Sequence, residues 1–188
     1  MKKYDVGLLV GRFNVFHIGH KSLADLALTM CDRLLILVGS AQESGTLRNP
    51  FSVKTRIKMI NEIYPDDNVV VHGLPDLTNE NDITPEWGKY LLSSVHAIIG
   101  KNPDVMIYGN DESRSGWFAP EDIKDIMEIV VPRSGIPISA TELRQLMVDN
   151  NWLKWCEYHS PELHEHYYDL RLELMNCPHY KEKNKCMN

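Results

Sequence analysis

The chain alternates between short, nearly uninterrupted apolar runs and longer segments in which apolar residues recur at helical spacing. The apolar runs have the length of strands and lie at residues 5–10, 33–39, 68–74, 104–110 and 126–132. Such a run predicts a strand that is buried on both faces of a sheet. Segments of helical periodicity separate the runs and lie at residues 18–30, 52–63 and 84–99. Strands that alternate with helices in this way predict a parallel sheet built from βαβ units.

The alternation therefore predicts the α/β class: a Rossmann-like parallel sheet of five or slightly more strands, with helices on both faces and a C-terminal helical segment. We expect residues 1–150 to form this α/β domain. Residues 151–175 are expected to be a helical extension packed on the domain, with a helix that starts at Pro161 and runs to about Met175. The polar stretch KEKNK near the end predicts a flexible tail over residues 176–188.

Composition narrows the classes of partner. The chain of 188 residues is 43% hydrophobic and 24% charged, which is typical of a globular protein with a full core. Its net charge of −6 argues against nucleic-acid binding through general electrostatics. The sequence contains no apolar run long enough to span a membrane and no secretory pattern at its start, so we expect a cytoplasmic protein without membrane contact. The four cysteines form no CxxC pair and are expected to be free thiols.

The first candidate site is GRFNVFHIGH (residues 11–20), directly after the first predicted strand. On a helix, His17 and His20 share one face, and Gly19 lets a ligand approach the backbone. The N–H groups at the start of that helix favour an anion in the same place. The spacing therefore indicates a phosphate site. Two other interpretations stay open from these residues alone: a pair of metal ligands and ordinary surface histidines.

The second candidate is PISATELRQLM (residues 137–147), after the last predicted strand. Ser139 and Glu142 form an S-x-x-E capping box, which predicts that a helix starts here. Thr141 then lies in the first turn and Arg144 about one turn further on. A hydroxyl, backbone donors and a guanidinium in one place suit a di- or triphosphate. The alternative is a well-capped helix whose arginine is only solvated.

Together the two motifs, in this order on a βαβ pattern, resemble the nucleotidyltransferase superfamily with its HxGH and ISxTxxR signatures. GRFNVFHIGH is similar to the GRFQPFHxGH opening of archaeal-type nicotinamide mononucleotide adenylyltransferases. Residues 39–60, GSAQESGTLRNPFSVKTRIKMI, are similar to GSAQxSHTxxNPFTxxER of the same branch. The resemblance covers residues 4 to about 150. The chain departs from the family at Asn14, Val15 and Gly45, where the family has glutamine, proline and histidine.

The resemblance implies adenylyl transfer from ATP to the 5′-phosphate of nicotinamide mononucleotide by direct in-line attack, which gives NAD and pyrophosphate. It assigns catalysis to Arg12, His17, His20 and Arg144. The residues it implies for ATP binding are these four together with Gly11, Phe13, Gly19, Gly109, Asn110, Ser139 and Thr141. Those it implies for the mononucleotide are Ser40, Arg48, Asp76 and Trp87. Mg²⁺ is expected to arrive with ATP rather than in a protein carboxylate cage, and a homo-oligomer is expected.

Several alternatives remain at the level of the sequence. Pantetheine-phosphate adenylyltransferases and glycerol-phosphate cytidylyltransferases share both signatures, and a nucleotide sensor without turnover would be a protein of another class. The sequence does not rank nicotinamide against nicotinic acid mononucleotide. Trp87 could equally be a core residue of an amphipathic helix. The scattered histidines and cysteines of residues 156–186 do not match the spacing of a closed zinc site.

Overall fold

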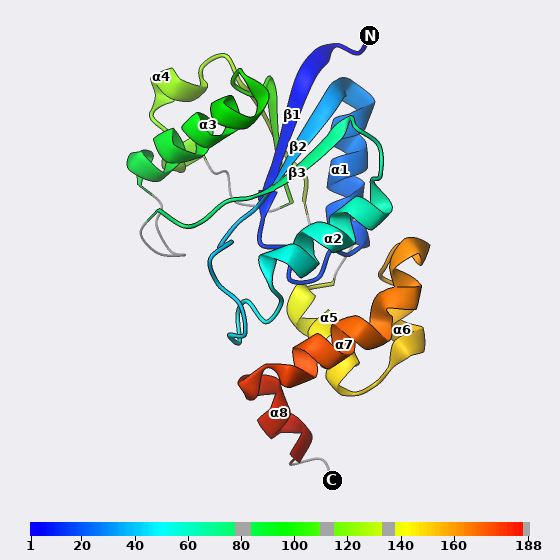
Figure 1. Cartoon of the computed structure of the whole chain (residues 1–188). Helices are drawn as coiled ribbons and strands as arrows, with labels where there is room; N and C mark the ends of the chain where they lie inside the picture. The colour runs from blue at the N-terminus through cyan, green and yellow to red at the C-terminus, as the bar shows by residue number, and fades with distance from the viewer. Residues whose placement is uncertain (78–83, 110–114, 133–137, 186–188) are drawn as a thin grey trace.

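The structure is a computed structural model and describes residues 1–77, 84–109, 115–132 and 138–185. Its centre is a sheet of five parallel strands in the order β3-β2-β1-β4-β5 (Figure 1). The strands are β1 (Tyr4–Gly11), β2 (Cys31–Val38), β3 (Val69–Gly73), β4 (Val105–Tyr108) and β5 (Met127–Val130). They coincide with the apolar runs, so the prediction of a Rossmann-like parallel sheet is confirmed.

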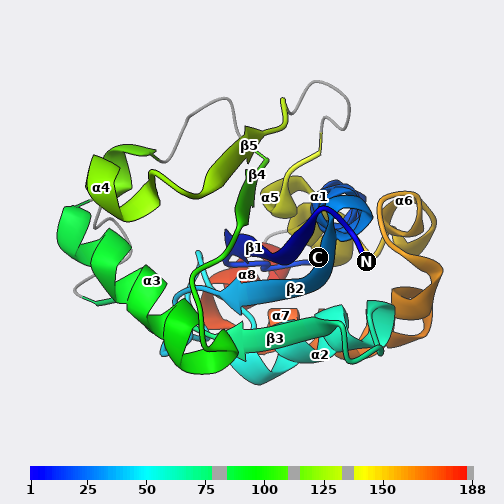
Figure 2. The ribbon, with the colours of Figure 1, turned by 90° about the horizontal axis from the view of Figure 1, so that it is seen from above.

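Helices cover both faces of the sheet (Figures 1 and 2). Within the α/β part they are α1 (Ile18–Met30), α2 (Val53–Ile63), α3 (Pro85–Ile99), α4 (Pro120–Ile123) and α5 (Ala140–Val148), with a 3₁₀ turn at Ser115–Trp117. Helices α1 and α2 lie on one side of the sheet, and α3 and α4 lie on the other. The predicted start of α3 is confirmed, with Thr84 as its N-cap and Pro85 in the first helical position.

Successive side chains of β2 point to opposite faces of the sheet and belong to two different apolar clusters. Leu34, Ile36 and Val38 belong to an apolar cluster that includes the inner faces of α1 and α2. Leu35 and Leu37 belong to a second cluster, which α3 covers. All five of these side chains are fully buried. A strand with both faces covered needs an unbroken apolar run, which is why the sequence pattern located it.

The chain after residue 150 packs beyond the carboxyl ends of the strands (Figure 1). It contains α6 (Trp152–Cys156), a 3₁₀ helix (Pro161–His166), α7 (Tyr167–Asn176) and α8 (Pro178–Lys185). Trp155, Leu163 and Tyr167 are fully buried in the same cluster as α1 and α2. The extension therefore shares the core of the α/β part. No helix in the described part of the chain is long and apolar enough to cross a membrane.

The described part of the segment for which composition predicts a flexible tail, residues 176–185, includes a helix. Residues 178–185 form α8, and the side chains of Cys177 and Tyr180 are each only 3% exposed. Two buried side chains among polar neighbours give too weak a periodic signal to predict a docked helix. The described cysteines, Cys31, Cys156 and Cys177, are free thiols as expected, and Cys186 lies outside the described residues.

Candidate functional site

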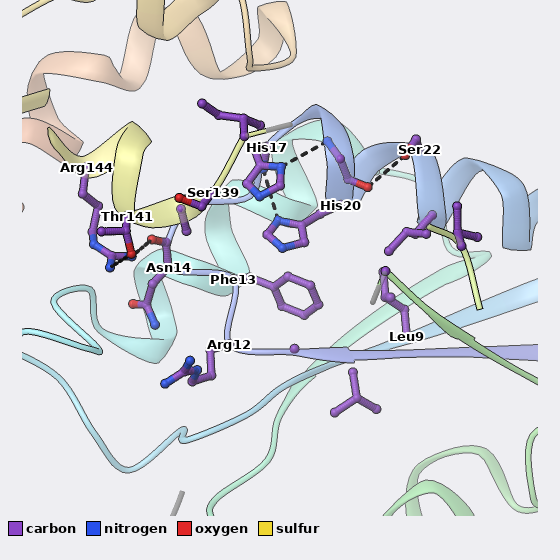
Figure 3. Close-up of a pocket in the computed structure, with 18 of the residues that line it drawn as sticks. Leu9, Arg12, Phe13, Asn14, His17, His20, Ser22, Ser139, Thr141 and Arg144 are labelled. Atoms are coloured by element: carbon purple, nitrogen blue, oxygen red, sulfur yellow. Dashed lines mark hydrogen bonds between the residues drawn. The ribbon is translucent and has the colours of Figure 1, made fainter. Parts of the chain in front are cut away.

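A cavity of about 660 Å³ opens at the carboxyl ends of the strands, between the exits of β1 and β4. The strand order reverses at this point, because β1 pairs with β2 on one side and with β4 on the other. Such a switch point separates the loops that leave neighbouring strands and leaves a crevice for a ligand. The β1–α1 connection, residues 131–132 after β5 and the first turn of α5 line the cavity (Figure 3). Segments that are far apart in the sequence thus meet at this cavity.

His17 and His20 are fixed by the start of α1. His17 is the N-cap, and its Nδ1 accepts a hydrogen bond from the Gly19 backbone N–H at 3.1 Å. The Nδ1 of His20 accepts from the His17 backbone N–H at 3.4 Å, and the two rings stack at 3.8 Å (Figure 3). A ring nitrogen that accepts carries no proton, so each neutral imidazole has its N–H at Nε2. The cap therefore determines which nitrogen of each histidine donates.

Phe13 packs against the ring of His20. Its ring lies edge-on to His20, with centroids 5.0 Å apart at 88°. The backbone of Phe13 is left-handed, with φ of 50°, which is costly for a residue with a Cβ and is found where function requires a given geometry. A Cβ at Gly11 would lie 2.9 Å from the Phe13 ring, so glycine at that position makes room for it. The turn after β1 is therefore built to bring this aromatic ring against His20.

The capping box predicted at the start of α5 is present. The Ser139 hydroxyl accepts from the Glu142 backbone N–H at 3.2 Å, and the Glu142 carboxylate accepts from the Ser139 backbone N–H at 2.8 Å. The Ser139 hydroxyl also donates to the Glu142 carboxylate at 2.7 Å, and this bond, together with the one from the Ser139 backbone N–H, holds the pKa of Glu142 below its usual value. The cap places the first turn of α5, including Thr141, at the wall of the cavity. The positive end of the helix dipole is thus directed at the same space as α1.

Arg144 joins the two motifs. Its Nη1 donates to the backbone carbonyl of Asn14 at 2.8 Å and its Nη2 to the Thr141 hydroxyl at 3.1 Å. Its Nε donates to the Tyr180 hydroxyl at 2.8 Å. The side chain lines the cavity and is 7% exposed, and each terminal nitrogen keeps a second N–H. The guanidinium is therefore held in place with donors left for a ligand.

Arg56 is a site residue that the sequence interpretation missed. It is fully buried on α2, and it donates to the backbone carbonyls of Arg12, Gly39, Ser40 and Glu43 at 2.7–3.2 Å. Burial lowers its pKa to about 10, so it stays charged at neutral pH. Arg56 thereby ties the exits of β1 and β2 together. The signal was available, since the arginine that ends the family pattern NPFTxxER corresponds to Arg56.

Asn14, where the chain departs from the family pattern, takes part in a buried chain of amides. Its Nδ2 donates to Asn49 Oδ1 at 2.7 Å, and the Nδ2 of Asn49 donates to Glu43 at 2.8 Å. Asn14 is 4% exposed and Asn49 is fully buried. These bonds attach the loop of residues 43–50 to the turn after β1. That loop carries Arg48, which lines the cavity.

Most of the residues expected at the site meet at this cavity. Those that line it are Gly11, Arg12, Phe13, His17, Gly19, His20, Arg48, Gly109, Ser139, Thr141 and Arg144. Asn110 lies outside the described residues. The described lining of the cavity does not include Ser40, Asp76 or Trp87.

Ser40 and Asp76 lie together after β2 and β3. The Ser40 hydroxyl donates to Asp76 at 3.2 Å, and Gln42 donates to the same carboxylate at 2.9 Å. Trp87 is 9% exposed on α3, and its ring packs edge-on against Trp117 at 4.9 Å. Trp87 therefore packs as a core residue in this structure, and its contact with a mononucleotide stays a prediction.

The chemistry of the cavity suits anions. Its described lining has three arginines, two imidazoles and three hydroxyls but no carboxylate: Arg12, Arg48, Arg144, His17, His20, Ser22, Ser139 and Thr141. Over the described ranges of the chain there is also no group of three or more His, Cys, Asp or Glu side chains that could hold a metal ion. The donor set fits the oxygens of a polyphosphate, and it fits a divalent cation that phosphate oxygens coordinate.

Comparisons with known proteins identify similar chains. The sequence profile of the cytidylyltransferase-like family matches residues 8–152. A nicotinamide-nucleotide adenylyltransferase of Halobacterium salinarum is 38% identical over 147 residues, which are 77% of this chain and 76% of that protein. One of Saccharolobus solfataricus is 33% identical over 108 residues, or 53% of this chain and 60% of that protein.

Among solved structures, a bifunctional NMN adenylyltransferase/ADP ribose pyrophosphatase of Francisella tularensis superposes with a TM-score of 0.72 at 25% identity. That structure is complexed with AMP and a manganese ion. The superposition covers 95% of this chain and 51% of the Francisella chain. The chain thus spans about half the length of that protein.

Proposed function

The chain belongs to the cytidylyltransferase-like family, and within it we propose that the protein transfers the adenylyl group of ATP to the 5′-phosphate of nicotinamide mononucleotide. The observation that carries this proposal is the convergence of His17, His20 and the first turn of α5 on one cavity whose described lining has no carboxylate. The names of the Halobacterium and Saccharolobus relatives support the choice of acceptor.

The proposed reaction needs no covalent bond to the protein. An oxygen of the mononucleotide phosphate bonds to the α-phosphorus of ATP, and the bond from that phosphorus to the β-phosphate oxygen breaks. Pyrophosphate leaves with the electron pair, and NAD is the other product. Such a transfer depends on positioning and on stabilisation of the developing charge.

We assign those tasks to the residues that meet at the cavity. The Nε2–H groups of His17 and His20 stabilise the charge on the oxygens of the α-phosphorus, since the cap at the start of α1 directs the proton to Nε2. The start of α5 and the second N–H groups of Arg144 hold the phosphates that leave. Arg12 contributes a further positive charge from the turn after β1.

Mg²⁺ enters this scheme as part of the nucleotide substrate. The Francisella structure is complexed with AMP and with a manganese ion, so a related protein binds both a nucleotide and a divalent cation. Because the described lining of the cavity contains no carboxylate, we propose that phosphate oxygens and water supply the ligands of the cation. In this scheme the residues that line the cavity bind the phosphates and do not coordinate the cation.

We propose that the mononucleotide binds along the surface that runs from Arg48 to the carboxyl ends of β2 and β3. Arg48 lines the cavity beside the turn after β1 and suits the 5′-phosphate of the mononucleotide. The hydrogen-bonded pair of Ser40 and Asp76 offers polar contacts further along the same edge. Trp87 is the candidate for stacking on the nicotinamide ring, and in this structure its ring packs edge-on against Trp117. A cytoplasmic location and a homo-oligomeric state stay predictions.

A matrix of substrates tests the proposal. Purified protein is mixed with ATP or CTP and with one acceptor at a time: nicotinamide mononucleotide, nicotinic acid mononucleotide, pantetheine phosphate or glycerol phosphate. The expected result is pyrophosphate release with ATP and a pyridine mononucleotide, in equal amount to the dinucleotide formed. Release with only pantetheine phosphate, or with only CTP and glycerol phosphate, would assign another acceptor. Binding of ATP without any pyrophosphate would point to a sensor.

A further inference from the structure

We propose that Tyr180, on α8 near the end of the chain, is a positioning residue for nucleotidyl transfer because it orients Arg144. The kinetic part of this inference rests on the proposed function. Tyr180 is 3% exposed, and its hydroxyl lies 2.8 Å from the Nε of Arg144. The residue lies in a segment that composition predicts to be a flexible tail, and outside residues 8–152, which the family profile matches.

The Tyr180 hydroxyl connects two parts of the site at once. It accepts the hydrogen bond from Arg144 Nε, and it donates its own proton to the backbone carbonyl of Leu47 at 3.2 Å. A phenol has a single proton to donate and lone pairs to accept with, so the two bonds are compatible. One hydroxyl therefore links the arginine of α5 to the loop of residues 43–50.

A second contact from the same end of the chain holds that loop. The thiol of Cys177 donates to the backbone carbonyl of Gly45 at 3.1 Å. Cys177 is also 3% exposed, so both contacts lie in the interior. Because Arg48 lies between these contacts and the amide chain of Asn49, the loop is fixed on either side of the arginine that lines the cavity.

The bond at Nε gives Tyr180 a role that the other partners of Arg144 do not have. Asn14 and Thr141 accept from the two terminal nitrogens, which are also the nitrogens whose second N–H groups remain for phosphate. Tyr180 accepts from Nε, which joins the guanidinium to the rest of the side chain and carries a single N–H. Fixing all three nitrogens determines the plane of the guanidinium, and hence the direction of the remaining donors.

The kinetic test compares two substitutions of buried tyrosines in the same C-terminal extension. Tyr180→Phe keeps the ring and removes the hydroxyl. Tyr167→Phe is the matched control, because Tyr167 is fully buried on α7 and its hydroxyl has no hydrogen-bond partner among the described residues. Tyr180→Phe is expected to lower kcat by about 10- to 100-fold, as for a misplaced group at a transfer site. Tyr167→Phe is expected to stay within about twofold of the wild type.

A double-mutant cycle separates positioning from a purely structural role. If Tyr180 acts through Arg144, then Tyr180→Phe in an Arg144→Ala background changes kcat by less than about twofold. A role in stability alone would lower the melting temperature and reduce activity equally in both backgrounds. That additive result would overturn the inference, and so would a kcat of Tyr180→Phe equal to that of the wild type.

A measurement on the wild type keeps the inference testable if Tyr180→Phe does not fold or if the proposed reaction is not observed. In a ¹⁵N spectrum the Nε–H of Arg144 is identified by its loss in Arg144→Lys. Burial and the bond to Tyr180 are expected to protect this N–H from exchange with solvent. Exchange as fast as in free arginine would show that the bond is absent in solution and would overturn the inference. Absence of NAD formation together with a protected Nε–H would contradict only the proposed function.

Discussion

Replacement of Arg56 by lysine is expected to destabilise the whole site from a position that lines none of the cavity described. The Arg56 guanidinium donates five hydrogen bonds, to the backbone carbonyls of Ser52, Arg12, Gly39, Ser40 and Glu43. These carbonyls belong to the turns after β1 and β2 and to the start of α2. The ammonium of a lysine has three N–H donors and lacks the planar fork, so at least two of the carbonyls lose their partner.

The number of lost bonds sets the size of the effect. A buried polar group without a partner costs about 1–3 kcal/mol, so Arg56→Lys is expected to lower the free energy of unfolding by about 2–5 kcal/mol. For a chain of this length that corresponds to a fall of about 5–15 °C in melting temperature. The charge is retained, so the effect measures the geometry of the donors rather than the loss of a cation.

Urea unfolding followed by tryptophan fluorescence checks this value, since Trp155 is fully buried and reports on the core. Arg33→Lys is the matched control, because Arg33 forms a half-exposed ion pair with Asp5 and is expected to cost less than about 1 kcal/mol. Equal free energies of unfolding for Arg56→Lys and the wild type, with unchanged m-values, would refute the assignment of Arg56 as the tie between the two turns.

Two further predictions concern stability. Burial lowers the pKa of His159 to about 3, so the unfolded chain binds a proton between pH 6.5 and 3 that the folded chain does not, and stability falls as the pH falls through that window. Between pH 7 and pH 5 the free energy of unfolding is expected to fall by about 2 kcal/mol for this reason. This fall should be absent in His159→Phe. An identical pH dependence of stability in the variant and the wild type would contradict the prediction. Gly88→Ala should lower the free energy of unfolding by about 1–3 kcal/mol, because a Cβ there would lie 2.2 Å from the backbone oxygen of Trp117. Wild-type stability in a denaturation curve of that variant would show that α3 and the 3₁₀ turn do not pack this closely.

Much of the fold could be predicted because the sheet leaves a strong mark on the sequence. A strand covered on both faces, such as β2, requires an unbroken apolar run, and each run predicted a strand of the sheet. The two motifs could also be assigned to one edge, since the carboxyl ends of parallel strands share it. His17, His20 and Arg144 accordingly meet at the cavity.

The residues that hold the site together were harder to predict, because their partners are backbone groups distant in sequence. Arg56 belongs by its spacing to an ordinary amphipathic helix, and only the fold reveals the carbonyls around its guanidinium. Tyr180 follows residues with little apolar periodicity, and its partner Arg144 lies 36 residues earlier. Pattern analysis detects buried faces and caps, and it does not detect a single buried hydroxyl in a polar segment.

Of the residues expected to contact the mononucleotide, only some line the cavity, because packing within each helix or loop sets where a side chain lies. Arg48 lines the cavity, whereas Ser40 and Asp76 bond to each other beside it and Trp87 packs against Trp117. A family pattern assigns positions along a chain, but the distance of a side chain from a ligand depends on the packing of its own helix or loop. The positions of Ser40, Asp76 and Trp87 therefore depend on packing that the family pattern does not encode.

The central claim is that the two imidazoles at the start of α1 promote the transfer of the adenylyl group. Its most direct test is the rate of NAD formation from ATP and nicotinamide mononucleotide by His20→Ala, compared with the wild type and with His96→Ala, a substitution at an exposed position of α3. We predict a loss of about 100-fold or more in kcat for His20→Ala in a protein that stays folded, with its stability lowered by about 0.5–2 kcal/mol through the lost cap, and a rate near that of the wild type for His96→Ala. A His20→Ala enzyme that forms NAD at the rate of the wild type would contradict the account.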